Sequence, residues 1–150
     1  MKFLPLLGKK LKDDEVIEIL DGLDMEVIYI FDRSHENMPD IYSAPSEPKG
    51  FQFRFDDAQN LEVVYLYITP QDGFAAVSQP DCDVPFFVSK QDVEAFGEAQ
   101  HLQVIKGSAD FLGVYRDWVL LEFATHSIHY EFRAGSLAMV TISRIDKPAA

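Results

Sequence analysis

The sequence is poor in cysteine and in basic side chains. Cys82 is the only cysteine among 150 residues, so no internal disulfide can form. This excludes a secreted domain held together by disulfides and favours a reducing, cytoplasmic location. Lysine and arginine number 13 against 25 aspartates and glutamates, which gives a net charge of −12. A protein that binds the phosphate backbone needs a basic surface, so we do not expect a nucleic-acid partner.

Long apolar stretches are also missing. No segment approaches the roughly 18 apolar residues that a membrane-spanning helix requires. The apolar run at residues 3–7 is too short for the core of a signal peptide, and it leads directly into Lys9 and Lys10. We therefore expect neither a membrane partner nor an export signal.

Signatures of catalysis and metal binding are absent as well. The sequence contains no G-x-S-x-G, glycine-rich phosphate loop, H-E-x-x-H or EF-hand loop. His126 and His129 are three residues apart, and in a strand such residues point to opposite faces and cannot easily share an ion. Cys82 lies between Asp81 and Asp83, whose charges disfavour a thiolate. We predict no catalytic residue, no metal and no cofactor.

Large apolar side chains are abundant, with 47% hydrophobic and 13% aromatic residues. Such a chain can bury a core, and its length fits a single domain over residues 1–150.

The first half has the pattern of a helix followed by strands. Apolar residues at helical spacing predict a helix from Asp13 to Leu23, with acidic residues in its first turn. Strands are expected at residues 26–31, 51–55 and 61–68. Residues 32–49 contain three prolines and predict a long loop with one short extended piece near Ile41.

The second half repeats this order. Residues 69–83 are rich in proline and glycine and predict a linker. Ser89 to Asp92 resembles a capping box and predicts a short helix that ends at Gly97. Five extended pieces are expected after it, at residues 101–106, 111–116, 118–125, 127–133 and 137–144.

The two halves also match at one spacing. These pairs are each 77 residues apart: Val16 and Val93, Phe53 and Tyr130, Phe55 and Phe132. Beyond the following turn the spacing is 76, as one residue fewer in the second turn would give. We predict two repeats, at about residues 7–68 and 84–144; the alternative is two unrelated α+β halves. The repeats predict an α+β fold, with two helix-plus-meander units forming one curved antiparallel sheet and both helices on one face.

This pattern resembles the tandem helix-plus-meander repeat of the β-lactamase inhibitor protein and its relatives. The resemblance rests on Asp13-Asp14-Glu15-Val16 with Phe53-x-Phe55, on Gln91-Asp92-Val93 with Tyr130-x-Phe132, and on Val84-Pro85-Phe86. It covers about residues 7–68 and 84–144, although the disulfides and export signals of secreted members are absent here. The chain also resembles small, acidic cytoplasmic immunity proteins of bacteria. Both resemblances imply a protein that inhibits another protein.

Acidic residues gather in the first half, which has 15 acidic and 7 basic side chains. Arg33 is the only basic residue among six acids within twenty residues: Asp21, Asp24, Glu26, Asp32, Glu36 and Asp40. Asp56 and Asp57 add two carboxylates at a predicted turn, where aspartate is common for backbone reasons. Two interpretations stay open for this surface, a solvated acidic face and a docking surface for a basic protein.

Tyr65 and Tyr67 lie on one face of the predicted strand 61–68. Tyrosine is favoured at interfaces, which makes both candidates for partner binding. The alternative is that they cap a sheet edge or pack under the proline-rich loop.

The phenylalanines of strand 51–55 lie on a face that depends on the hairpin register. Pairing Phe55 with Leu61 places them beside the tyrosines, and pairing Asp56 with Leu61 places them on the opposite face.

We therefore predict a non-enzymatic cytoplasmic protein, an immunity protein that occludes the active site of a basic cognate toxin. The alternative is a small-ligand-binding or housekeeping protein with an aromatic-lined groove. A homodimer through an uncovered sheet edge is also compatible with the sequence.

Overall fold

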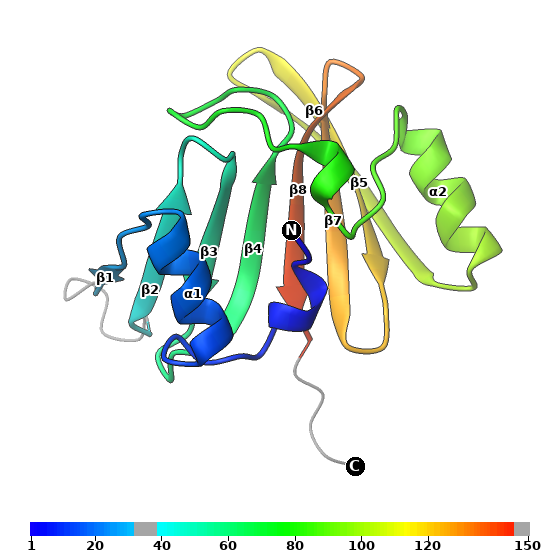
Figure 1. Cartoon of the computed structure of the whole chain (residues 1–150). Coiled ribbons are helices and arrows are strands. Elements are labelled where there is room, and N and C mark those ends of the chain that lie inside the picture. The colour runs from blue at the N-terminus through cyan, green and yellow to red at the C-terminus, as the bar shows by residue number, and fades with distance from the viewer. Residues whose placement is uncertain (32–38, 146–150) are drawn as a thin grey trace.

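The residues that the structure describes fold into an α+β structure with one eight-stranded antiparallel sheet and two α-helices (Figure 1). This computed structural model describes residues 1–31 and 39–145. The first-half elements are η1 (Leu4–Leu6, a 3₁₀ turn), α1 (Asp14–Gly22), β1 (Ile28–Ile30), β2 (Ile41–Ser46), β3 (Phe51–Phe55) and β4 (Leu61–Tyr67). The second-half elements are η2 (Gln79–Asp81, a 3₁₀ turn), α2 (Lys90–Ala99), β5 (Gln103–Phe111), β6 (Val114–Glu122), β7 (His126–Arg133) and β8 (Ser136–Arg144).

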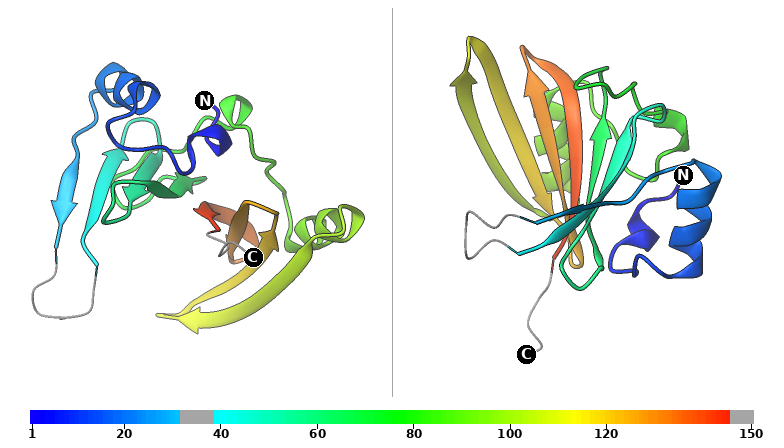
Figure 2. Two further views of the ribbon diagram at one scale, coloured as in Figure 1. Left: turned by 90° about the horizontal axis from the view of Figure 1, so that it is seen from below. Right: turned by 90° about the vertical axis from the view of Figure 1, so that its left-hand side faces the viewer.

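The strands follow the order β1-β2-β3-β4-β8-β7-β6-β5. Strands β1 to β4 form one meander and strands β5 to β8 form another, and the two meanders join where β4 pairs with β8. The strands β1 and β5 are therefore the two edges of the sheet, which twists between them (Figure 2). None of the described helices is both long and apolar enough to cross a membrane.

One face of the sheet carries the hydrophobic core. Residues paired across neighbouring strands point to the same side. One such row is at most 1% exposed: Ala44, Phe53, Val64, Ile142, Ile128 and Leu121. We call this side the core face. Val16 and Leu20 of α1 and Val93 of α2 are buried in the same cluster.

The predicted helices are present, with one boundary wrong. The helix expected from Asp13 is α1, and Ser89 Oγ accepts a hydrogen bond from the Asp92 amide at the start of α2, as the capping pattern predicts. However, α2 does not end at Gly97. A Cβ there would lie 2.6 Å from Val104 Cγ2 and 2.8 Å from Leu121 Cδ2. The glycine allows α2 to approach the sheet closely rather than ending the helix.

Two strand predictions were also wrong. The five extended pieces of the second half are four strands, because β5 and β6 are nine-residue strands joined by a two-residue turn at Leu112 and Gly113. The turn end of this hairpin extends beyond Arg116, the first residue of β6 that pairs with β7. This end therefore lacks the alternation of apolar and polar residues that marks a half-buried strand.

The predicted long loop at residues 32–49 contains β2, a six-residue strand, where only a short extended piece near Ile41 was expected. Residues 32–38 of this loop lie outside the described residues. Pro45 is tolerated in β2 because β1 pairs only as far as Ser43, so Pro45 pairs with β3 alone. The neighbouring side chain Ala44 is fully buried on the core face. Proline therefore does not exclude a strand at this position.

The β3–β4 hairpin follows neither predicted register throughout. Phe55 does pair with Leu61, but the register shifts between Arg54 and Phe55, so that Phe53 pairs with Val64. The extra residue is Glu62, which lets Leu61 and Val64 both point into the core. The phenylalanines consequently lie on the core face rather than beside Tyr65.

Candidate partner-binding site

Among the described residues, the longest run of exposed apolar side chains covers the edge strand β1 and one residue on either side of it. Residues 27–31 are Val, Ile, Tyr, Ile and Phe, and each is between 40% and 48% exposed. Soluble proteins scatter single exposed hydrophobic residues, whereas a continuous group of them marks an interaction surface. We call residues 27–31 the exposed strand.

Aromatic rings brace the exposed strand against β2. The Tyr29 ring lies 5.0 Å from the Tyr42 ring and 5.4 Å from the Phe31 ring, measured between centroids. The Tyr29 hydroxyl donates a hydrogen bond to the Asp40 carboxylate. These contacts hold an apolar surface in place next to a negative charge.

The predicted acidic residues lie at both ends of this strand. Asp21 is exposed in the last turn of α1, and Asp24 and Glu26 are exposed in the segment between α1 and β1. Asp40 is half-buried at the entry to β2. Asp32 and Glu36, the other two predicted members, lie outside the described residues. Asp13, Asp14 and Glu15 lie at the other end of α1, where Glu15 pairs with Lys9 at 3.5 Å, so Asp24, Glu26 and Asp40 supply the charge nearest to β1. The apolar strand is therefore bordered by negative charge.

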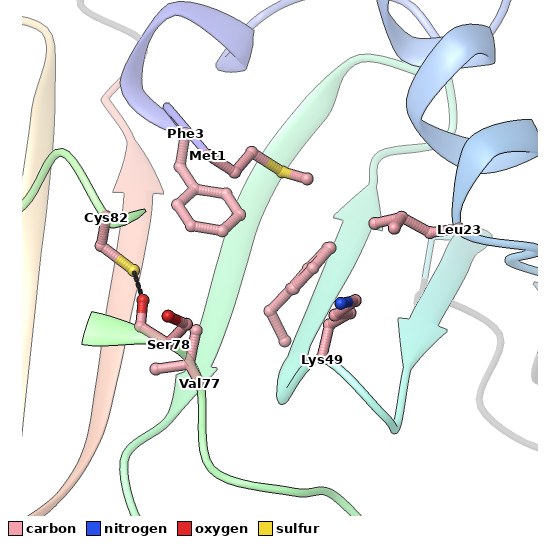
Figure 3. A pocket seen from close by; sticks show the side chains of 8 residues that line it. Met1, Phe3, Leu23, Lys49, Val77, Ser78 and Cys82 are labelled. Atoms are coloured by element: carbon pink, nitrogen blue, oxygen red, sulfur yellow. Dashed lines mark hydrogen bonds between the residues drawn. The ribbon is translucent and has the colours of Figure 1, made fainter. Parts of the chain in front are cut away.

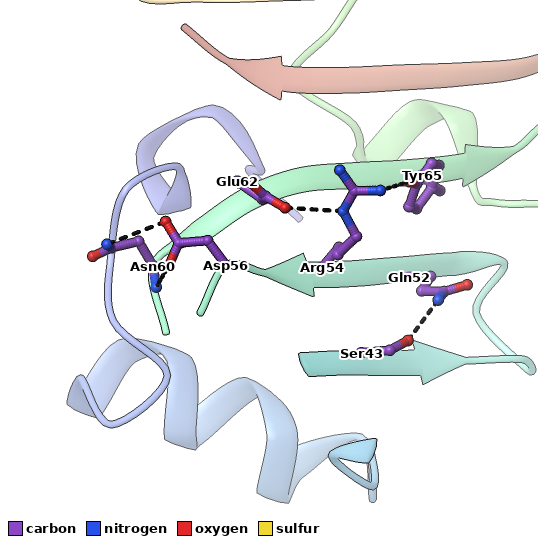
Figure 4. Close-up of polar contacts among 7 residues, drawn as sticks. All are labelled: Ser43, Gln52, Arg54, Asp56, Asn60, Glu62 and Tyr65. Carbon is purple, nitrogen blue, oxygen red and sulfur yellow. Dashed lines mark hydrogen bonds and ion pairs between the residues drawn. The ribbon is translucent and has the colours of Figure 1, made fainter. Parts of the chain in front are cut away.

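Asp56 and Asp57 belong to a different place, the turn between β3 and β4. The Asp56 carboxylate accepts hydrogen bonds from the backbone amide of Asn60 at 2.8 Å and from its side chain at 3.3 Å (Figure 4). This contact closes the turn, which is a common role for aspartate. Asp57 is exposed.

Tyr65 and Tyr67 lie on the face of the sheet opposite to the core, which we call the tyrosine face. Polar contacts hold both side chains there. The Arg54 guanidinium bridges Glu62, at 3.0 Å from Nε to Oε1, and the Tyr65 hydroxyl, at 3.0 Å from Nη1 (Figure 4). Tyr65 is half-buried. Its surface remains partly available to a partner.

Tyr67 is only 7% exposed. Its ring stacks on Phe74 of the following loop at 4.1 Å, and its hydroxyl donates to Gln52 Oε1 at 3.3 Å. Burial raises the pKa of the Tyr67 phenol, and the nearby Asp72 charge adds to this shift. The ring thus packs under the proline-containing loop and offers little surface to a partner.

The opposite half of the same face carries a second aromatic pair. Trp118 and His129 stack with centroids 5.3 Å apart. Burial lowers the pKa of His129, and the Glu131 charge opposes this only in part. His126 stacks instead on Phe123 at 4.5 Å. Among residues 1–31 and 39–145, no three His, Cys, Asp or Glu side chains are grouped so as to hold a metal ion.

A small cavity of about 220 Å³ lies between the N-terminal segment, β3 and the loop before η2 (Figure 3). It is lined mainly by apolar side chains: Met1, Phe3, Leu23, Phe51 and Val77. The polar residues Lys49, Ser78 and Cys82 also border it, and the Cys82 thiol donates to the Ser78 carbonyl at 3.4 Å.

Asp83, which follows Cys82 in the sequence, holds the N-terminal segment. Its carboxylate accepts hydrogen bonds from the backbone amides of Phe3 at 2.8 Å and Leu4 at 3.0 Å. These are the first donors of the η1 turn. The residue joins two segments 80 positions apart, which nothing in the local sequence could indicate.

Comparison with protein-family models, curated proteins and solved structures finds no match to this chain. The candidate site therefore depends on the geometry above. That geometry places Asp24, Glu26 and Asp40 beside the exposed strand, whereas Asp21 lies on α1. It leaves the β3–β4 turn and the tyrosine face as separate surfaces.

Proposed function

We propose that this protein is a non-enzymatic binding protein, an immunity protein that neutralises a basic bacterial toxin in the cytoplasm by covering its active site. The observation that carries the proposal is the exposed strand, which Asp24 and Glu26 precede and which Asp40 contacts through Tyr29. Apolar area supplies affinity in protein interfaces, while complementary charge speeds association and selects the partner. A basic active site, such as that of a nuclease, has the charge that matches this surface.

The scaffold we propose is a duplicated unit. Its two inner hairpins shift register between Arg54 and Phe55 and between Glu131 and Phe132, which are 77 residues apart. A bulge at the same position in two unrelated hairpins is an improbable coincidence. This agreement supports a common origin of the two halves.

The centre of the sheet supports the same proposal. Tyr65 on β4 pairs with Thr141 on β8, and these residues are 76 positions apart. A twofold axis between two repeats would pair equivalent residues in this way. Val16 and Val93, also equivalent, are both fully buried, as expected if α1 and α2 cover the same face. The opposite face and the sheet edges would then serve for contacts with a partner.

A second candidate function is the binding of a small apolar molecule, which the cavity beside Phe3 and Phe51 favours. At about 220 Å³ it is smaller than the roughly 300–1,000 Å³ typical of ligand pockets. We therefore prefer a protein partner.

The decisive experiment uses the product of the neighbouring reading frame. If that product is basic and toxic when expressed alone, co-expression of this protein should restore growth, and the purified pair should form a complex. Because the proposed attraction is electrostatic, the association rate should fall by at least about tenfold between 50 and 500 mM salt. No complex, or binding that is indifferent to salt, contradicts the proposal.

A pair of charge-reversed variants tests which surface binds. Asp21→Lys combined with Glu26→Lys should slow association by about tenfold at low salt. The control is Glu98→Lys combined with Asp110→Lys, which changes the net charge equally at exposed positions of the second half. Equal slowing by both variants would show only a general charge effect and would contradict a local docking surface.

A further inference from the structure

The two edges of the sheet differ in how they are protected. An edge strand is open to pairing with another chain, and proteins guard such edges with lysine, proline or covering elements. The edge strand β5 carries Lys106, which forms an ion pair with Glu94 of α2 at 3.1 Å. The other edge, β1, has no charged residue and no proline at residues 27–31.

The unguarded edge is also the more apolar one. Every residue of the exposed strand is at least 40% exposed, including Ile28 and Ile30 on one side of the strand and Tyr29 on the other. Because β1 is a terminal strand, another strand added beside it would extend the sheet and cover side chains on both sides. An exposed apolar edge strand without such protection promotes aggregation unless another strand pairs with it.

The charge around the edge decides between two occupants. A second copy of the chain would place the Asp24 and Glu26 end of β1 against either the same end or the Asp40 end of the other copy, and like charges there oppose association. An extended segment that carries lysine or arginine would meet opposite charge at both ends of β1, including the Asp40 carboxylate held by Tyr29.

We propose that the edge of β1 binds an extended, basic segment of the partner by adding it as a ninth strand. This inference rests on the proposed function for the identity of the partner, and it names the docking element. Backbone hydrogen bonds to β1 would supply part of the affinity. Alternating apolar side chains of the segment would pack on the exposed strand, and its lysine or arginine side chains would reach the carboxylates of Asp24, Glu26 and Asp40.

A defined peptide tests the proposal without the toxin. The probe is a capped octapeptide of alternating lysine and valine, added to the ¹⁵N-labelled full-length protein and followed by amide chemical shifts. We expect the largest shifts at residues 27–31 and in β2. Methylation of alternate peptide nitrogens should weaken binding at least tenfold, because it removes backbone donors. A peptide of alternating glutamate and valine should not bind.

Ile30→Lys is the matched variant, since it adds a guarding charge at a position that is already 44% exposed. It should weaken peptide binding at least tenfold while the remaining amide spectrum stays unchanged. Leu112→Lys is the control, because Leu112 is 88% exposed at the far end of the β5–β6 hairpin. The control should bind the peptide as the unmodified protein does.

Several outcomes overturn the proposal. They are no binding at millimolar peptide, shifts centred on the tyrosine face or the cavity, and equal binding of the methylated peptide. A homodimer in sedimentation that Ile30→Lys dissociates would show that a second copy is the occupant. If the neighbouring product still binds and growth is still restored, the proposed function stands and only the docking element is wrong.

Discussion

The ring of Trp118 covers Gly107 on the neighbouring strand. The two residues are register partners on β6 and β5, and a Cβ on Gly107 would lie 2.5 Å from Cζ2 and 2.7 Å from Cε2 of the indole. A glycine within a strand normally weakens it, and an aromatic ring packed across the glycine compensates by shielding the backbone.

Gly107→Ala should therefore destabilise the protein. The added methyl group must displace the indole, which we expect to lower the free energy of unfolding by about 1–3 kcal/mol. Trp118 is the only tryptophan, so its fluorescence reports both the displacement and the unfolding transition in urea. Gly22→Ala is the control, because nothing lies within 4 Å of its Cβ position, and it should be neutral or slightly stabilising. Unchanged stability and emission in Gly107→Ala would contradict this packing.

Asp83→Ala should loosen the N-terminal segment. The substitution leaves the amides of Phe3 and Leu4 without their acceptor, at an expected cost of about 1–3 kcal/mol. Hydrogen exchange should accelerate at these two amides more than in the central strands. Asp72→Ala, at an exposed loop position, is the control. Equal exchange in both variants would show that the carboxylate does not hold the segment.

Tyr130→Phe should destabilise the protein although its shape barely changes. The side chain is fully buried, and its hydroxyl donates to the Pro85 carbonyl at 2.8 Å. Burial raises the pKa of this phenol, so the group remains a donor at neutral pH. Loss of the donor should cost about 1–3 kcal/mol in urea denaturation. Tyr115→Phe, at a residue that is 49% exposed, should cost nothing measurable.

The stability of the protein should fall on mild acidification, partly through His129. Burial holds the pKa of folded His129 below its ordinary value, so the unfolded chain binds the proton more readily. The free energy of unfolding should therefore decrease as the pH falls through about 6.5, the ordinary histidine pKa. Above that pH both the folded and the unfolded chain leave His129 neutral, so His129 should not make the free energy of unfolding depend on pH.

His129→Gln isolates this contribution. Between pH 7.5 and 5.5 the variant should lose less stability than the unmodified protein, as measured by urea midpoints at each pH. The exposed His101 provides the control His101→Gln, which should follow the unmodified protein. A pH dependence that is identical in all three proteins would exclude His129 as the cause.

Several structural features could be predicted from residue patterns. Apolar residues at helical spacing located α1, the serine cap located the start of α2, and the alternation of residues 51–55 located β3. These signals are local, because each depends on residues within one or two turns or along one strand. The predictions at Gly97 and Pro45 were wrong because local patterns do not show distant contacts. Gly97 lies against Val104 and Leu121, and Pro45 is tolerated because β1 pairs only as far as Ser43.

The candidate site was predictable only in part. The acidic residues of the first half were evident from the sequence, but an apolar run such as residues 27–31 looks the same whether the strand is central or at an edge. Its exposure follows from strand order, in which β1 is terminal while β4, which is also rich in apolar residues, is central. Tyr65 and Tyr67 looked equivalent by alternation, yet Phe74 covers Tyr67 and leaves it 7% exposed.

The sequence by itself determined the net charge, the disulfide content and the local elements. These are the net charge of −12, the absence of an internal disulfide, the helices and most of the strands. Tertiary structure alone decided that β4 meets β8, that Glu62 is the bulged residue and that β1 lies at an edge. The physical reason is that strand pairing and burial join residues far apart in the chain. Which apolar residues become core and which become surface is settled only when those strands are assembled.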